Sequence, residues 1–295
     1  ERLAHYSRGR LAWTEEVGWR VYDGRRWVGS SSGALVSEVA ISVMRHAIPM
    51  EIQIASELGD PEEEFDPEAW KKHLARSESA SGLHAMISLA RAKCMVPSAR
   101  FDSDPMLLNV QNGTLDLRTG RLRPHNPDDF ITQITTVAWV PGHHEAPHWE
   151  DFITWMGCER DELVAYLQRV AGYCLTGDVS EQIMPILHGD GANGKSVFAE
   201  VLQGVLGEYA APGAPGLVMM KDGTDHPTAV AGMRGRRLVV VSETQENARL
   251  DESRVKQLTG DETPTAVVAT MTSLAPCVVP TAIDAAFVSV VEPIR

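Results

Sequence analysis

Apolar positions near the start of the chain alternate with polar ones, which is the spacing of β-strands. Between residues 18 and 28, runs of aromatic and β-branched residues flank the pair Asp23-Gly24. An Asp-Gly pair in this setting favours a hairpin closed by a type I′ turn, because both central residues of that turn need a positive φ. The pattern predicts a small sheet with Trp19 and Trp27 in its core. Stacking of a nucleobase on these rings is the alternative interpretation.

The spacing then becomes helical. Apolar residues recur every three or four positions from Gly33 to Leu58. A second helical stretch runs from Asp66-Pro67 toward Cys94, and proline suits a first helical turn because no N–H is needed there. A hairpin followed by two helices predicts a small α+β domain.

Short strands separated by turns are predicted for residues 101–141, where Asn-Gly and Thr-Gly pairs interrupt the alternation. Several prolines follow, and helical spacing returns between Trp149 and Gly177, carried in part by Phe152, Trp155 and Met156. We expect the α+β domain to cover residues 1–145 and a helical linker or collar to cover 146–180.

Two buried strands and one helix are predicted in the next part of the chain. Residues 183–187 have the composition of a buried strand, and Val197–Leu206 has helical spacing. A second apolar run, Leu238–Val241, leads into Ser242-Glu243. The pattern therefore predicts a strand that ends in a carboxylate.

A phosphate-binding loop is predicted between the first of these strands and the helix. Residues 189–196 read Gly-Asp-Gly-Ala-Asn-Gly-Lys-Ser, and the glycines permit a nest of inward backbone N–H groups. The N-terminus of the following helix favours an anion. Lys195 is expected to reach the β- and γ-phosphates, and Ser196 to ligate Mg²⁺. The predicted ligands are ATP and Mg²⁺, held by Gly189, Asp190, Gly191, Ala192, Asn193, Gly194, Lys195 and Ser196. A glycine-rich turn that matches by chance is the alternative.

Glu243 is the candidate for orienting or deprotonating the attacking water. A nucleotide hydrolase needs acidic chemistry near Mg²⁺ at the end of a second strand, and Glu243 follows an apolar strand at a suitable distance from the loop. It is also a candidate metal ligand, through a water molecule. An ordinary carboxylate at a strand end is the alternative. Ser242 stands where many such enzymes carry an aspartate.

The charge balance limits how this chain can bind nucleic acid. It has 27 basic and 40 acidic residues, a net charge of −13. Proteins that coat nucleic acid are usually basic, because neutralisation of phosphates dominates their affinity. Any contact with DNA is therefore expected from a few local loops. No apolar run in the sequence has the length of a membrane span, and there is no signal-peptide pattern.

Neither the cysteines nor the histidines indicate a metal centre. The four cysteines, Cys94, Cys158, Cys174 and Cys277, are far apart and form no CxxC pair, which favours reduced thiols. Residues 144–148 match the HExxH spelling of zinc proteases. That motif needs both histidines on one helix face, and Pro147 inside it is incompatible with a continuous helix. An incidental surface loop is the prediction.

Several motifs in order resemble the phage/plasmid primase-helicase family of superfamily 3 helicases. They are the phosphate loop in its Asn-Gly-Lys-Ser form, the strand end at Ser242-Glu243, and the segment Leu250–Asp261. Upstream, the segments Leu107–Gly120 and Pro124-His125 resemble the domain before the helicase in poxvirus- and phage-type members. The resemblance covers roughly residues 10 to 266.

The resemblance implies an α/β P-loop NTPase with an AAA+-like superfamily 3 helicase core, preceded by the α+β domain and the linker. It implies an ATP-driven homo-hexamer that moves along single-stranded DNA and unwinds forked duplex, with a primase domain upstream or in trans. Lys256 corresponds to a segment leading toward DNA in the ring channel, and a solvated helix lysine is the equal alternative. The implied location is the cytoplasm of a bacterial host.

The C-terminal part departs from the family pattern. The helicase core is expected over residues 181–266 and is truncated, because no channel hairpin, sensor asparagine or arginine finger is recognisable after it. Residues 267–295 are expected to form an atypical tail that arose by frameshift or truncation. The leading hypothesis is thus a replicative DNA helicase that this tail leaves impaired. The alternatives are a non-catalytic ATP-binding or oligomerisation remnant of a prophage protein and a small-molecule kinase.

Overall fold

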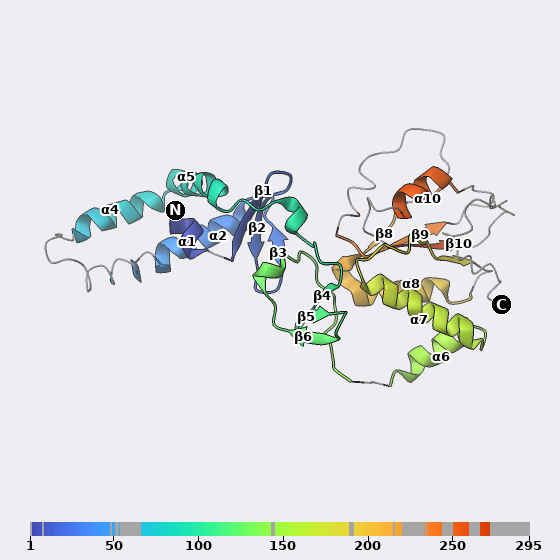
Figure 1. The fold of residues 1–295 in the computed structure, drawn as a ribbon. Coiled ribbons are helices and arrows are strands. Elements are labelled where there is room, and N and C mark those ends of the chain that lie inside the picture. The colour runs from blue at the N-terminus through green and yellow to red at the C-terminus, as the bar shows by residue number, and fades with distance from the viewer. Residues whose placement is uncertain are drawn as a thin grey trace. The chain divides into compact units, whose positions relative to one another are not determined.

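The computed structural model describes residues 2–7, 9–47, 49–50, 53, 66–142, 145–188, 192–214, 216–219, 233, 235–243, 250–259 and 266–271. The chain divides into two compact units (Figure 1). The first unit comprises Glu1–Ser103 and Asn126–Thr132, and the second comprises Asp104–His125 and Gln133–Arg295. The small strands after residue 104 thus belong with the second unit, whereas the sequence placed a domain boundary near residue 145.

The predicted hairpin lies in the first unit. Strands β1 (Leu11–Thr14), β2 (Gly18–Tyr22) and β3 (Trp27–Gly29) form an antiparallel sheet in that order. The prediction of a type I′ turn was wrong. The loop between β2 and β3 has four residues, 23–26, and within it Gly24 alone has a positive φ, 102°. Asp23 closes the loop, because its Oδ1 accepts hydrogen bonds from the backbone N–H groups of Arg25 and Arg26 at 2.8 and 2.9 Å.

Both hairpin tryptophans are core residues, as predicted. Trp19 is 6% exposed and Trp27 is 2% exposed. The Trp27 ring stacks on Phe130 at 5.6 Å between centroids and meets Phe101 edge-on at 5.9 Å. Its Nε1 donates to the carbonyl of Pro127 at 2.9 Å. A buried ring with a satisfied indole N–H is the arrangement of a core tryptophan.

Helices complete the first unit: α1 (Arg2–Tyr6), α2 (Ala34–Ser42), α4 (Pro67–Ser77) and α5 (Ala80–Ala90). The helix predicted from Gly33 continues past α2 as a π-helical turn, Val43–Ala47, and most of the remainder of that prediction lies outside the described residues. The stretch predicted as one helix toward Cys94 is two helices. The first ends at Ser77, and Ser79 caps the second, accepting from the N–H of Gly82 at 3.1 Å.

The second unit begins with the predicted short strands, β4 (Leu107–Val110), β5 (Gly113–Asp116) and β6 (Arg121–Arg123), paired antiparallel in sequence order. Two helices follow as expected, α6 (Pro147–Met156) and α7 (Asp161–Leu175). Pro147 occupies the first turn of α6. Met156 is buried on the inner face, but Trp155, expected on the same apolar face, is 53% exposed.

A parallel four-stranded sheet forms the rest of the second unit. Its strands are β7 (Ile186–His188), β8 (Ala210–Pro212), β9 (Leu238–Glu243) and β10 (Ala266–Met271), in the order β7-β10-β9-β8. Helices α8 (Lys195–Leu206) and α10 (Glu252–Thr259) lie on opposite faces of it in Figure 1. The first strand is shorter than predicted, since it starts only after Pro185, which has no N–H for a ladder hydrogen bond.

The strand β10 corrects the expected tail. Residues 267–271 were assigned to an atypical C-terminal segment, yet β10 lies between β7 and β9 and pairs with both. The run Ala-Val-Val-Ala-Thr-Met suits a strand covered on both faces, where apolar residues need not alternate with polar ones. Residues 272–295 lie outside the described part of the chain, and their origin by frameshift or truncation stays a prediction.

The core of the parallel sheet is apolar and closely packed. Val239 and Val241 of β9 are buried together with Val255 and Leu258 of α10. The α/β class predicted for this part of the chain is therefore confirmed. Among the described residues, no helix combines the length and apolar character needed to cross a membrane.

Candidate functional site

The carboxyl ends of three parallel strands meet at one edge of the sheet in the second unit. Met271, the last residue of β10, is the register partner of His188 at the end of β7 and of Glu243 at the end of β9. Two strand spacings separate His188 and Glu243, about 10 Å. In open α/β sheets, ligands bind outside the carboxyl ends of the strands. The predicted loop and the predicted carboxylate thus lie at the same edge.

The predicted loop connects β7 to α8 at this edge. Gly189, Asp190 and Gly191 lie outside the described residues. The remaining part has an unusual backbone: Ala192 has φ 61° and Gly194 has φ 84°, both in the left-handed region. Gly194 directly precedes α8, and within the part of the chain that the structure describes no side chain caps the N-terminus of that helix. An anion is the group that the helix dipole favours there.

Two buried polar side chains lie at the start of α8. Lys195 is 7% exposed, and its Nζ donates a hydrogen bond of 2.6 Å to Oδ1 of Asn193, which is 4% exposed. Among the described residues, the amide nitrogen of Asn193 has no hydrogen-bond partner. This loop combines the ammonium group with an unsatisfied amide donor, and both fit phosphate oxygens. Ser196 is exposed beside them.

Aromatic rings of α6 pack against the same loop. A Cβ placed on Gly194 would lie 2.9 Å from Cζ3 of Trp155 and 3.0 Å from Cε2 of Phe152. The ring of Trp149 stacks on Phe198 of α8 at 6.0 Å with an interplanar angle of 10°. Glycine before Lys195 is thus required by its left-handed φ and by these rings. From the sequence, the α6 aromatics were expected only in a helical collar, since spacing does not reveal which neighbour a helix contacts.

The other predicted site residues are less informative. Glu243 ends β9 at the edge described above, and Lys256 is exposed on α10. His144 of the HExxH spelling lies outside the described residues, and Pro147 begins α6. Within the described ranges, no cluster of three metal-ligating side chains forms. Lys256 as a DNA contact stays a prediction.

The described cysteines are free thiols, Cys94, Cys158 and Cys174. Burial raises the pKa of Cys174 to about 12, which keeps this thiol protonated and unreactive at neutral pH. Cys277 lies outside the described residues.

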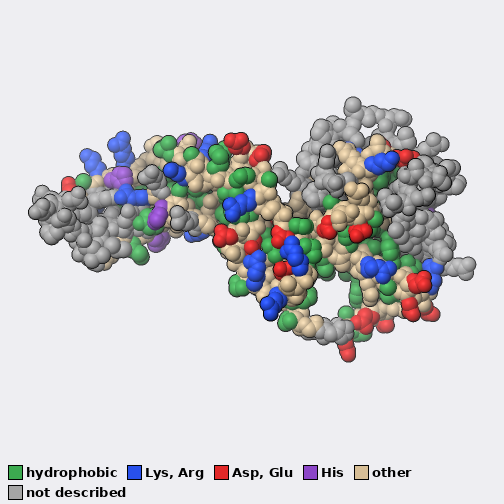
Figure 2. Space-filling view, in the orientation of Figure 1, with side chains coloured by type: hydrophobic (Ala, Val, Ile, Leu, Met, Phe, Trp, Pro, Cys, Tyr) green, Lys and Arg blue, Asp and Glu red, His purple; other side chains and the backbone are tan. Residues whose placement is uncertain are grey.

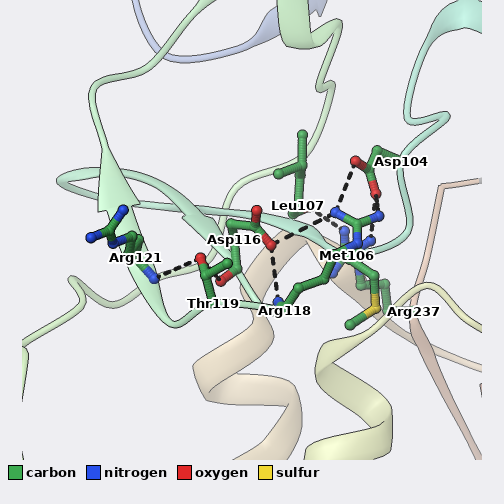
Figure 3. A network of polar contacts seen from close by, with 8 residues as sticks. All are labelled: Asp104, Met106, Leu107, Asp116, Arg118, Thr119, Arg121 and Arg237. Atoms are coloured by element: carbon green, nitrogen blue, oxygen red, sulfur yellow. Dashed lines mark hydrogen bonds and ion pairs between the residues drawn. The ribbon is translucent and has the colours of Figure 1, made fainter.

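A polar network missed by the sequence analysis holds the other end of β9 (Figure 3). Arg237, 7% exposed, donates to the carbonyls of Leu175 and Leu107, and its guanidinium lies 4.5 Å from the ring centre of Tyr209. It thereby ties the start of β9 to α7 and β4. An arginine next to a strand has no sequence signal for this role, because its partners are distant backbone carbonyls.

Asp104 and Arg118 form the exposed part of this network. Nη2 of Arg118 donates to Oδ1 of Asp104 at 2.6 Å, and Nη1 donates to Oδ2 at 3.2 Å. These hydrogen bonds from Arg118, more than the nearby charge of Arg237, hold the pKa of Asp104 below its usual range. The pair is a two-pronged ion pair between the start of β4 and the loop after β5.

Charges on the surface are mixed. On the face drawn in Figure 2, basic and acidic side chains of the described residues are interspersed, and no broad basic face forms there.

Comparison with known proteins gives a family and a fold. The family model described as "D5 N terminal like" matches residues 1–158. A protein of Acanthamoeba polyphaga mimivirus named "Putative helicase" is 26% identical over 169 residues, which cover 56% of this chain and 18% of the relative. A protein of African swine fever virus named "Putative primase" is 28% identical over 165 residues, covering 53% of this chain and 17% of the relative. The chain thus spans less than a fifth of these relatives.

Among solved structures, the fold resembles the apo C-terminal region of NrS-1, with a TM-score of 0.52 at 10% identity. The match covers 93% of this chain and 57% of that one. A second structure of the same region gives a TM-score of 0.51 at 10% identity, covering 92% of this chain and 56% of the other. At this identity the likeness concerns the fold alone.

Proposed function

The chain belongs to the D5 N-terminal-like family, which occurs in viral and phage primase-helicase proteins, and we propose that it is the ATP-driven motor part of such a protein. In this proposal it binds ATP with Mg²⁺ and couples hydrolysis to movement along single-stranded DNA and to unwinding of forked duplex. The observation that carries the proposal is the shared sheet edge, where the loop with buried Lys195 and the strand end at Glu243 come together.

Each residue of the loop has a role in this proposal. The backbone N–H groups at the start of α8 and the Lys195 ammonium bind the β- and γ-phosphates, and the amide nitrogen of Asn193 donates to a phosphate oxygen. Asn193 Oδ1 holds Lys195 in place until the nucleotide arrives. The hydroxyl of Ser196 would hold Mg²⁺, which would supply neutralisation of the phosphate charge.

Glu243 orients the attacking water and accepts its proton. Its strand ends next to β10, two strands away from β7, at the edge of the sheet from which the loop begins. Ser242 contributes a hydroxyl and no charge, so Ser196, the nucleotide and, through a water molecule, Glu243 would hold the metal. A homo-hexamer with Lys256 among its DNA contacts, and a primase domain in the same or another chain, complete the proposal.

ATP turnover with and without single-stranded DNA tests the proposal. We expect Lys195→Ala to lose ATP binding and turnover together, and Glu243→Gln to keep binding while turnover falls by about 100-fold or more. Lys93→Ala, at an exposed lysine of the first unit, is the matched control and should change neither. Binding without turnover in the unaltered chain would favour the alternative, a non-catalytic ATP-binding or oligomerisation remnant. Turnover that survives in Lys195→Ala would contradict the assigned site.

Assembly is tested by light scattering during size-exclusion chromatography, with and without ATP. The proposed ring predicts a hexamer whose formation depends on the nucleotide. A monomer under both conditions would argue against a ring motor.

The kinase alternative is tested separately. DNA-independent transfer of phosphate to a small molecule would favour a kinase.

A further inference from the structure

Three aromatic side chains on one face of α6 form a ladder that leads to the phosphate loop. Trp149, Phe152 and Trp155 are spaced three residues apart, and their ring centroids are separated by 5.6 and 6.2 Å along the helix. At one end, Trp149 stacks on Phe198 of α8. At the other end, Phe152 and Trp155 contact Gly194 of the loop.

Exposure increases along this ladder. Trp149 and Phe152 are half-buried, whereas Trp155 is 53% exposed. Val197, in the first turn of α8, is 49% exposed. The ring of Trp155, which lies against Gly194, and the side chain of Val197, two positions after Lys195, thus both remain in contact with water. The first two rings fix α6 against α8, and this anchoring holds the third ring next to the loop.

We propose that Trp155 is the stacking platform for the base of the nucleotide whose phosphates the loop binds, with Val197 as a second apolar contact. This rests on the proposed function, because it assigns the other end of the same ligand. A base presents a planar π-face, and an exposed indole ring is the side chain best suited to cover it. The Asn193 amide and the Lys195 ammonium provide the polar end of the site.

The charges around α6 favour a nucleotide base over a strand of DNA on this ring. Glu150 and Asp151 are exposed on α6, and Glu159, Asp161 and Glu162 are exposed just after it. A DNA backbone that crossed Trp155 would bring its phosphates close to these carboxylates, which repel them. The base of a bound nucleotide is uncharged, and its phosphates lie in the loop.

Stacking alone does not distinguish between bases, because each has a π-face. The platform therefore predicts that ATP and GTP bind with affinities within a few-fold of each other. It also predicts that a ligand without a base gains nothing from Trp155.

Calorimetric titration of the full chain with Mg²⁺-ATP and with Mg²⁺-tripolyphosphate tests this assignment. We expect Trp155→Ala to weaken ATP binding about tenfold and to leave tripolyphosphate binding unchanged, and Trp155→Phe to restore most of the ATP affinity. In the unaltered chain, ATP should quench tryptophan fluorescence more than tripolyphosphate does, and Trp155→Phe should remove that difference. Trp139→Ala is the control: Trp139 is a partly buried tryptophan of the same unit, in the loop whose Thr136 contacts the opposite end of α8.

The outcomes separate the two proposals. If the unaltered chain binds neither ligand, the phosphate site itself is wrong and the base platform fails with it. If both ligands bind and Trp155→Ala retains full ATP affinity, the base platform alone is overturned. Equal loss of both ligands in Trp155→Ala would make Trp155 a structural support of the loop, which also overturns the platform.

Discussion

The two units use aromatic clusters in opposite ways. In the first unit, Trp27 and Phe130 are enclosed, and the Arg100 guanidinium covers the Phe130 ring at 4.3 Å. In the second unit, the ladder on α6 ends in the exposed ring of Trp155, against the loop before Lys195. A cluster whose rings are buried against one another contributes chiefly to stability. An open cluster next to buried polar groups retains a surface for a ligand.

The polar side chains show the same contrast. Arg100 of the first unit and Arg237 of the second lie at similar distances from an aromatic ring, 4.3 and 4.5 Å. Arg100 is exposed, whereas Arg237 is buried and donates to two backbone carbonyls. The two arginines thus lie at similar distances from a ring but are expected to contribute differently to the free energy of unfolding. Substituting each of them in turn measures this difference.

The largest effect is expected from truncating the closed cluster. Trp27→Ala should lower the free energy of unfolding by about 3–5 kcal/mol, because it leaves a cavity between Phe101 and Phe130. Trp155→Ala should cost less than about 1 kcal/mol, since half of that ring already faces water. Urea denaturation followed by circular dichroism measures both. Equal losses of unfolding free energy in the two variants would contradict the difference proposed between the two clusters.

The arginine pair comes next. Arg237→Met should destabilise the protein by about 3 kcal/mol, because the carbonyls of Leu107 and Leu175 lose their donor inside the protein. For Arg100→Met we expect less than about 1 kcal/mol, the value of an exposed cation–π contact. The same denaturation experiment compares them. A larger loss at Arg100 would show that ring contact, and not the buried hydrogen bonds, dominates.

Two glycines with the same φ allow the cost of an added Cβ to be compared between the loop and the first unit. Gly194 and Gly18 both have φ 84°, but a Cβ at Gly18 meets nothing within 4 Å. Gly18→Ala should cost the left-handed strain alone, about 1 kcal/mol, and Gly194→Ala about 2 kcal/mol, because the rings of α6 obstruct its Cβ. Adding Trp155→Ala to Gly194→Ala should recover part of the difference. No recovery in this double-mutant cycle would contradict the contact.

The smallest effect concerns the exposed ion pair of Asp104. Arg118 holds the pKa of this carboxyl lower in the folded state than in the unfolded state. The ion pair therefore stabilises the fold at pH values above the unfolded-state pKa, and this stabilisation disappears as the pH falls through the folded-state pKa. Because both side chains are well exposed, Asp104→Asn should cost less than about 1 kcal/mol at neutral pH, and the cost should vanish once the pH is below the folded-state pKa of Asp104. Unfolding curves across this range measure it. A difference that persists in acid would point to packing and not to charge.

Local patterns account for the parts of the fold that the sequence predicted well. The hairpin around Gly24, the short strands β4–β6 and the helix α8 each depend on neighbouring residues: a turn pair, an alternation or a helical spacing. Two local predictions were wrong because side-chain hydrogen bonds to the backbone competed with the expected turn and helix. Asp23 formed side-chain hydrogen bonds that lengthened the turn, and Ser79 capped a new helix inside a continuous helical pattern.

The sequence by itself determined the phosphate-loop pattern, the strand ending in Glu243 and the α/β class, because these depend on residue type and short-range spacing. Only the tertiary structure decided that β10 lies between β7 and β9 and that Arg237 donates to carbonyls of distant segments. It also decided that the ring of Trp155 lies next to Gly194 while remaining exposed to water. Parallel pairing and contacts between helices join segments far apart in the chain. Their partners are selected by burial and hydrogen bonding over the whole unit, which no local pattern records.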